Sequence, residues 1–112
     1  MRYAVPVTDG KLAAHFGHCS HFALFDVDET IMAIVSKEVI MSPGHEPGFL
    51  PAWLAEEGIS VVIAGGMGSR AQDIFRENHI QVVIGVRSDD PEGIVLDYIK
   101  GTLEAGDNIC DH

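Results

Sequence analysis

The fold is decided by residues 60–86, which read SVVIAGGMGSRAQDIFRENHIQVVIGV. Two continuous apolar runs, at 60–64 and 81–86, are typical of strands that are covered on both faces. Between them lie a glycine-rich turn, Gly65-Gly66-Met67-Gly68, and a segment at 70–78 with apolar residues at helical spacing. A strand–helix–strand unit of this length requires parallel strands joined by a right-handed crossover.

Local signals mark the helices of this half. Ser69 is a candidate N-cap for the helix at 70–78, because serine side chains accept hydrogen bonds from first-turn N–H groups. A last helix is predicted at 91–101, with Asp89 or Asp90 as its cap and Pro91 at its first position. A short helix is predicted upstream, at 49–57, ended by a glycine.

The first part of the chain is rich in strands. Apolar runs at 2–7, 21–27 and 31–40 are separated by turn residues, and the second has apolar residues on both faces, which indicates an inner strand. The second and third strands read as a hairpin. We therefore predict an α/β fold with the order β-β-β-α-β-α-β-α, in which an antiparallel meander continues into a parallel unit to give a mixed five-stranded sheet flanked by helices.

Length and composition fit one soluble domain. The chain has 112 residues, of which 46% are apolar, enough for one modest core. We predict a domain at 1–103 and a flexible polar tail at 104–112. No apolar run approaches the ~20 residues that span a bilayer, and the start of the chain does not read as a signal peptide. The prediction is a cytoplasmic protein.

Charge excludes some partners. Seventeen acidic and seven basic residues give a formal net charge of −10, and no cluster of lysine and arginine offsets it locally. Such a surface repels phosphate backbones, so nucleic acids and anionic membranes are disfavoured as partners.

The densest group of chemically active residues is His15-Phe16-Gly17-His18-Cys19-Ser20-His21. Imidazole nitrogen and thiolate sulfur both suit zinc, copper, iron and iron–sulfur species. The spacing matches no zinc finger, and no second cysteine pair completes a tetrahedral set. His15, His18 and Cys19 are the candidate metal ligands, whereas His21, at the start of a strand, is the first to be assigned a structural role.

The tail offers a second pair of ligands. Cys110 and His112 stand two residues apart at the end of the chain, where they either fold over the site or stay unstructured. A structural disulfide between Cys19 and Cys110 is disfavoured in the cytoplasm.

The glycine turn is a candidate for binding an anion. Gly65, Gly66, Met67 and Gly68 precede a helix, where backbone N–H groups favour negative charge. The turn lacks the dinucleotide and P-loop patterns, so nucleotide binding has little support. The alternatives are that it is only a tight turn and that Met67 only fills the core.

A hydrolase is the weakest interpretation. Asp26 and Asp28 share one strand face and Asp89-Asp90 lie in a loop, where solvation and helix capping explain them. No nucleophile elbow is present.

Several motifs together resemble the dinitrogenase iron–molybdenum cofactor biosynthesis family, which includes NifX- and NafY-type domains and the C-terminal part of NifB. They are Tyr3-Ala4-Val5-Pro6-Val7, His15-Phe16-Gly17 with Phe22, Ile63-Ala64-Gly65-Gly66-Met67-Gly68-Ser69-Arg70-Ala71, Gly101-Thr102-Leu103 and Cys110-Asp111-His112.

The resemblance implies a ribonuclease H-like fold with strand order 3-2-1-4-5 and no nuclease activity. The family's better-known members bind or carry iron–molybdenum cofactor or its iron–sulfur precursor, and a related small type carries a molybdenum–copper sulfide cluster. The histidine of the His-Phe-Gly motif, here His15, is favoured as a cluster ligand in such proteins.

The implied strand order adds a physical argument. Strands one and four are then parallel neighbours whose following loops leave in different directions, and ligands bind at the carboxyl ends of such strands. We therefore expect the histidine segment and the glycine turn to face one cleft. The leading hypothesis is a non-catalytic carrier of an iron–sulfur or molybdenum–iron–sulfur cluster that works with cofactor-assembly proteins. The alternative is a metal-free regulatory or docking module for a redox enzyme or an ATPase.

Overall fold

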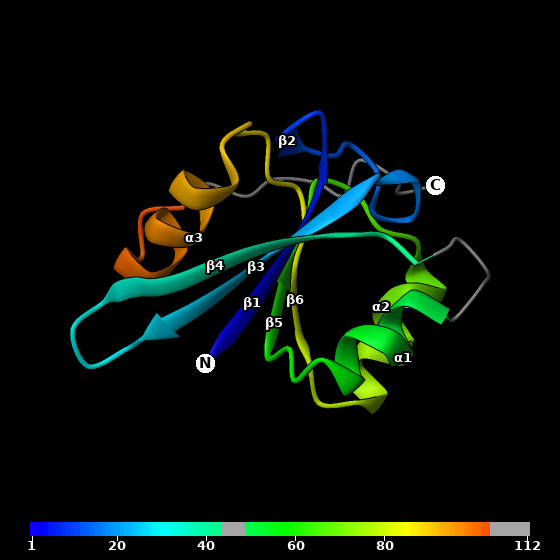
Figure 1. Cartoon of the computed structure of the whole chain (residues 1–112). Helices are drawn as coiled ribbons and strands as arrows, with labels where there is room; N and C mark the ends of the chain where they lie inside the picture. The colour runs from blue at the N-terminus through cyan, green and yellow to red at the C-terminus, as the bar shows by residue number, and fades with distance from the viewer. Residues whose placement is uncertain (44–48, 104–112) are drawn as a thin grey trace.

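A computed structural model describes residues 1–43 and 49–103. It shows a mixed α/β arrangement in which a twisted sheet has helices on both of its faces (Figure 1). The elements, in chain order, are β1 (Arg2–Thr8), β2 (Lys11–Leu12), η1 (Phe16–His18, one 3₁₀ turn), β3 (His21–Asp28), β4 (Ala33–Met41), α1 (Phe49–Glu56), β5 (Val61–Ile63), α2 (Ser69–Glu77), β6 (Gln81–Val83) and α3 (Pro91–Lys100).

The strand order is β4-β3-β1-β5-β6, with β2 paired to β1. Counted without β2, this is the predicted order 3-2-1-4-5. The β1–β3 and β3–β4 pairs are antiparallel, whereas β1–β5 and β5–β6 are parallel, also as predicted. The inner position of β3 and its hairpin with β4 are likewise confirmed.

The sheet has six strands rather than the five predicted. After β1, Asp9 and Gly10 adopt φ angles of 55° and 79°, which turn the chain back so that Lys11 pairs with Thr8. Two central residues with positive φ are what a tight hairpin turn needs, and an Asp-Gly pair favours that conformation. The sequence showed the turn, but β2 is two residues long, too short to display an alternating pattern.

Predicted element ends need small corrections. Gly68, not Ser69, is the N-cap residue of α2, because the chain is still extended at Gly68 and helical from Ser69 onward. Of the two candidate caps for α3, Asp90 is confirmed, since its carboxylate accepts a hydrogen bond from Gly93 N at 3.3 Å. Strand β4 begins at Ala33 rather than at residue 31 because Met32 has a φ of 55° and belongs to the turn.

The core has one layer on each side of the sheet. On one side, side chains of β3 such as Phe22 and Leu24 pack with Leu54 of α1 and Phe75 of α2. On the other side, residues of β1, β3 and β5 pack with Ile94 and Val95 of α3. Figure 1 shows α1 and α2 together on one side and α3 on the other. Within the described residues, α3 alone covers the second layer.

Candidate functional site

A buried phenylalanine anchors the histidine segment. Phe16, in η1, is 4% exposed, and its ring centroid lies 5.7 Å from that of Phe22 and 5.4 Å from that of Phe75. Offset and edge-on ring contacts at such distances are favourable. The short 3₁₀ turn is therefore held against the layer that α1 and α2 cover, although it makes few backbone bonds of its own.

A backbone hydrogen bond joins the histidine segment to the glycine turn. Phe16 N donates to Gly66 O at 2.8 Å, and on the other side of the turn Gly85 N donates to Gly65 O at 2.8 Å. Three segments thus lie side by side at the carboxyl ends of the parallel strands β1, β5 and β6. The glycine turn lies between the histidine segment and the loop after β6. The histidine segment and the glycine turn lie together, as the strand order predicted, and they are joined by a direct backbone bond. The cleft between them stays a prediction.

Two of the three histidines of this segment, His15 and His18, are exposed. His15 precedes η1 and His18 ends it, and their ring centroids lie 6.0 Å apart with the ring planes inclined at 61°. An anchored backbone thus presents two imidazoles to solvent beside the glycine turn. Neutral imidazole nitrogens are ligands for iron, copper and zinc.

Cys19 has a different environment. Its side chain is 1% exposed, among the residues of the Phe22 and Phe75 layer. Burial raises the pKa of the thiol to about 11, against a smaller opposing effect of hydrogen bonds from its own backbone N–H and from Ser42. At neutral pH Cys19 is therefore a buried thiol, whereas metals bind the thiolate. The role of Cys19 as a ligand stays a prediction, and it requires the segment to open.

The glycine turn combines buried and exposed parts. Gly65 and Gly66 are buried and Gly68 is exposed. Met67 is 1% exposed and belongs to the core layer, while its carbonyl oxygen accepts a hydrogen bond from Gln72 Nε2 at 3.0 Å. A cluster at this edge would therefore meet the exposed end of the turn and not the thioether of Met67.

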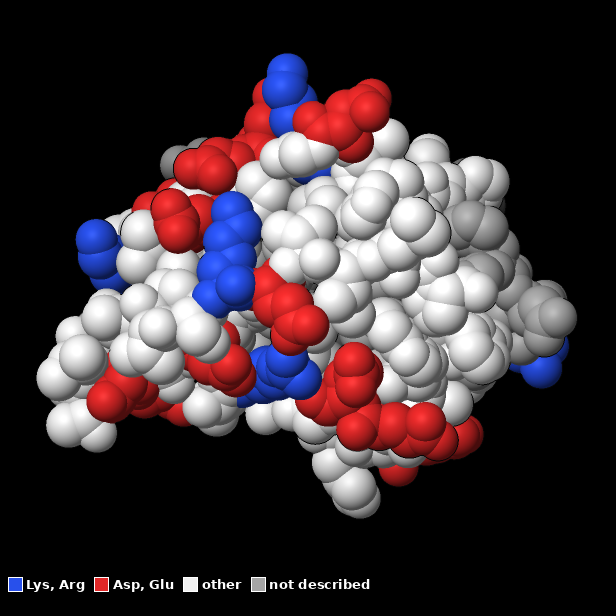
Figure 2. All heavy atoms as spheres, in the orientation of Figure 1, with Lys and Arg blue, Asp and Glu red and all other residues white. Residues whose placement is uncertain are grey.

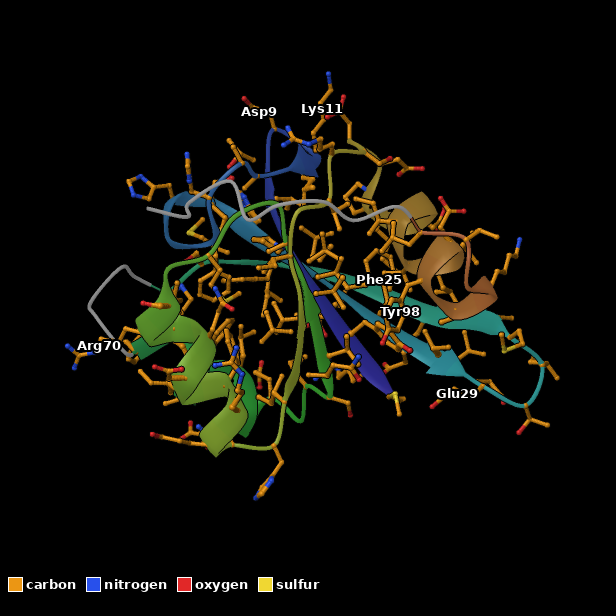
Figure 3. All side chains as sticks on the ribbon, turned by 180° about the vertical axis from the view of Figure 1, so that it is seen from behind. Asp9, Lys11, Phe25, Glu29, Arg70 and Tyr98 are labelled. Carbon is orange, nitrogen blue, oxygen red and sulfur yellow. The ribbon has the colours of Figure 1, made fainter. Side chains whose placement is uncertain are left out.

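The start of α2 suits an anion. The N-cap residue, Gly68, makes no side-chain hydrogen bond to the first turn, and that turn contains no acidic residue. Uncapped N–H groups at a helix N-terminus carry partial positive charge. Arg70 stands in the same turn and points outward into solvent (Figure 3), where it adds positive charge in a chain that is otherwise strongly acidic.

The candidate site is open. Within residues 1–43 and 49–103, no three histidine, cysteine, aspartate or glutamate side chains come together to hold a metal ion. Cys110 and His112 lie outside the described residues. His15 and His18 form an incomplete donor set, which does not fit a closed tetrahedral zinc site.

Comparison with known proteins identifies the family. The model of the family described as "Dinitrogenase iron-molybdenum cofactor" matches residues 1–101. The chain belongs to the dinitrogenase iron–molybdenum cofactor family. The resemblance seen in the sequence is thereby confirmed, and the family indicates a role connected with a metal-cluster cofactor.

Relatives of known sequence or structure agree with this membership. The uncharacterized protein MJ0580 of Methanocaldococcus jannaschii is 28% identical over 109 residues, which are 93% of this chain and 90% of that protein. The crystal structure of PH0822 superposes with a TM-score of 0.87 at 28% identity and covers 100% of both chains. The apo form of the orange protein of Desulfovibrio gigas has a TM-score of 0.71 at 22% identity, over 96% of this chain and 93% of that one, and so shares the fold.

Within the described residues, no helix has the length and apolar character needed to cross a membrane.

His21, which the sequence assigned to structure, lines a cavity on the α3 side of the sheet. Its position at the start of a strand gave no indication of that cavity.

The burial of Cys19 in this member of the cofactor family predicts slow alkylation. In a Cys110→Ser background at pH 8, Cys19 should react with iodoacetamide about 100-fold more slowly than a thiol of pKa 9, because the thiolate fraction falls tenfold for each unit by which the pKa rises. The rate should keep rising with pH toward about 11. The same experiment in urea gives the unfolded reference. Equal rates in the two conditions at pH 8 would contradict the buried thiol.

Proposed function

We propose that this protein is a non-catalytic carrier that binds a preformed iron–sulfur or molybdenum–iron–sulfur cluster, with His15 and His18 as ligands, and delivers it during cofactor assembly in the cytoplasm. The cluster is the cargo. The observation that carries the proposal is the 2.8 Å bond from Phe16 N to Gly66 O. That bond holds two exposed imidazoles next to a glycine turn at the carboxyl ends of β1 and β5, which is where ligands bind in sheets of this kind.

The incomplete donor set supports cargo made elsewhere. A cluster brings its own sulfides, so it needs few protein ligands. Because few protein–metal bonds then have to break, the cluster can be released to an acceptor. The imidazoles would bind an exposed metal atom, while the uncapped first turn of α2 and the exposed end of the glycine turn would face the sulfides. Hydrogen bonds and local positive charge of this kind stabilise iron–sulfur clusters. This local positive charge stands in a chain whose formal net charge is −10.

The carboxylates support a non-catalytic role. Asp26 accepts a hydrogen bond from Ser36 Oγ at 2.7 Å and lies 3.5 Å from Arg2 Nε, on the side of the sheet where α1 packs. Asp90 caps α3. These side chains are engaged in holding the fold together. The proposal therefore uses them for stability and assigns them no chemistry.

The test is anaerobic reconstitution of the wild-type chain with iron, sulfide and molybdate, followed by gel filtration, metal analysis and visible absorption. We expect metal and charge-transfer absorption to elute with the protein and to transfer to an apo acceptor when one is added. A wild-type chain that elutes without metal after reconstitution would overturn the proposal.

A second candidate is the metal-free docking module. Figure 2 shows that the part of the surface over the start of α1 and the end of β4 is nearly free of charged side chains. In addition, Met41 and Phe49 are 73% and 41% exposed. In a chain this acidic, an uncharged apolar area favours contact with another protein. This candidate predicts that replacing His15 and His18 leaves capture of the partner unchanged, whereas the carrier predicts that only the loaded wild-type protein is captured.

A further inference from the structure

The cavity beside His21 lies on the opposite side of the sheet from the anchor of the histidine segment. It encloses about 300 Å³ and is bounded by β1, β3, β4 and the start of α3. Its apolar floor consists of Val7, Ala23 and Val39, the last two being direct neighbours across the β3–β4 pair. Pro91, the first residue of α3, borders the cavity. A volume of this size holds a small organic molecule.

A lysine marks one end of the cavity. Lys37 lies opposite Phe25 in the β3–β4 register, with its Nζ atom 5.8 Å from the centre of that ring. Two other cations, Arg2 and Arg76, form ion pairs. Lys37 forms none within residues 1–43 and 49–103, although acidic residues outnumber basic ones in the chain by 17 to 7.

A carboxylate marks the other end. Asp9 lines the cavity and, in the part of the chain that is described, also forms no ion pair. Figure 3 shows Asp9 at the tip of the turn between β1 and β2, and Phe25 farther along the sheet. The two unpaired charges therefore stand at opposite ends of an apolar floor.

Between the two ends runs a polar wall. Ser20 Oγ donates to the Val7 carbonyl at 3.2 Å, and His21 Nδ1 lies 2.9 Å from the same hydroxyl. The contact between His21 Nδ1 and this hydroxyl orients the imidazole ring. Ser20, His21 and Val7 all line the cavity.

We propose that this cavity binds a small zwitterion whose carboxylate and ammonium groups are separated by a short apolar chain, the chemistry of an ω-amino acid. The carboxylate pairs with Lys37, the chain lies on Val7, Ala23 and Val39, and the ammonium pairs with Asp9. A ligand with a carboxylate at both ends is disfavoured, because its second carboxylate meets Asp9. The site is separate from His15 and His18, and it does not depend on cluster binding.

The test is a titration of the ¹⁵N-labelled full-length chain with three six-carbon probes, 6-aminohexanoate, hexanoate and adipate, monitored by NMR chemical shifts. We expect saturable shifts at residues of the cavity floor, with 6-aminohexanoate binding most tightly and adipate at least tenfold more weakly. Lys37→Met should weaken 6-aminohexanoate and hexanoate at least fivefold, and Lys37→Arg should restore both. Lys100→Met, which removes an exposed lysine at the end of α3, is the matched control and should change nothing.

Asp9→Asn tests the other end. Asparagine accepts the positive φ of this turn position, so the hairpin stays intact. We expect Asp9→Asn to weaken 6-aminohexanoate at least fivefold, to leave hexanoate unchanged and to let adipate bind as tightly as hexanoate. Three results would each overturn the assignment. The first is that none of the three probes saturates the shifts. The others are that Lys37→Met and Lys100→Met lose the same affinity for 6-aminohexanoate, or that Asp9→Asn weakens 6-aminohexanoate and hexanoate equally. Cluster retention in Lys37→Met should equal that of the wild type, which keeps the two sites distinguishable.

Discussion

Replacing both His15 and His18 by alanine should reduce the metal retained after anaerobic reconstitution to less than about a tenth of the wild-type amount, because disturbing even the partners of metal ligands costs about 10- to 100-fold in affinity. The two rings are exposed and stand 6.0 Å apart, so their loss removes donors without opening the core. Metal analysis and visible absorption after gel filtration measure the effect.

The matched control is His79→Asn. His79 is exposed and has a φ of 61°, and asparagine tolerates this conformation better than alanine does. The substitution removes an imidazole at the far end of α2 and should leave metal retention at the wild-type value. If the double variant keeps as much metal as His79→Asn, His15 and His18 are not the ligands. A stability measurement on all three proteins excludes unfolding as the cause.

The second large effect is on stability. Phe16→Ala should lower the free energy of unfolding by about 3–5 kcal/mol, the range for removing a buried aromatic ring. Phe16 is 4% exposed and contacts two other rings, so the cavity that it leaves cannot collapse easily. Because small domains are stabilised by only about 5–15 kcal/mol in total, the urea midpoint should fall sharply. Phe49→Ala, at a phenylalanine that is 41% exposed, should cost far less.

A milder variant connects this anchor to the site. Phe16→Leu keeps an apolar side chain and should fold, but it loses the ring contacts with Phe22 and Phe75. We expect its metal retention to fall more than its stability does, because the backbone bond to Gly66 depends on where η1 lies. Wild-type retention in a measurably destabilised Phe16→Leu protein would show that the anchor does not position the histidines.

Much of the fold could be predicted because several local signals agreed. Buried apolar runs, a glycine turn and a helical spacing point to the same β-α-β unit, and that unit requires a parallel pair. The proline at the first helical position limited the cap of α3 to Asp89 or Asp90, and the structure selects Asp90. By contrast, Ser69 has the right chemistry for a cap, but the backbone becomes helical one residue earlier than that role needs. Chemistry alone does not fix such a boundary.

The site was predictable in position and less so in detail. The order of the strands placed the histidine segment beside the glycine turn, and the bond between Phe16 and Gly66 bears this out. The burial of Cys19 could not be foreseen, because a cysteine between two polar residues shows no periodicity. Its side chain enters the core only because Phe16 and Phe22 hold the segment on both sides of it. The cavity beside His21 depends on where α3 lies, which no local pattern encodes.

The bond between Phe16 and Gly66 joins one main chain to another, and this affects how such a protein can evolve. Main-chain atoms are present whatever side chains a descendant carries. The bond from Phe16 N to Gly66 O therefore does not depend on the side chains at the exposed positions 15 and 18. Selection could exchange the donors at those two positions, and with them the cargo, without rebuilding the scaffold. Divergence in cargo among proteins of one shape would then require only a few surface substitutions.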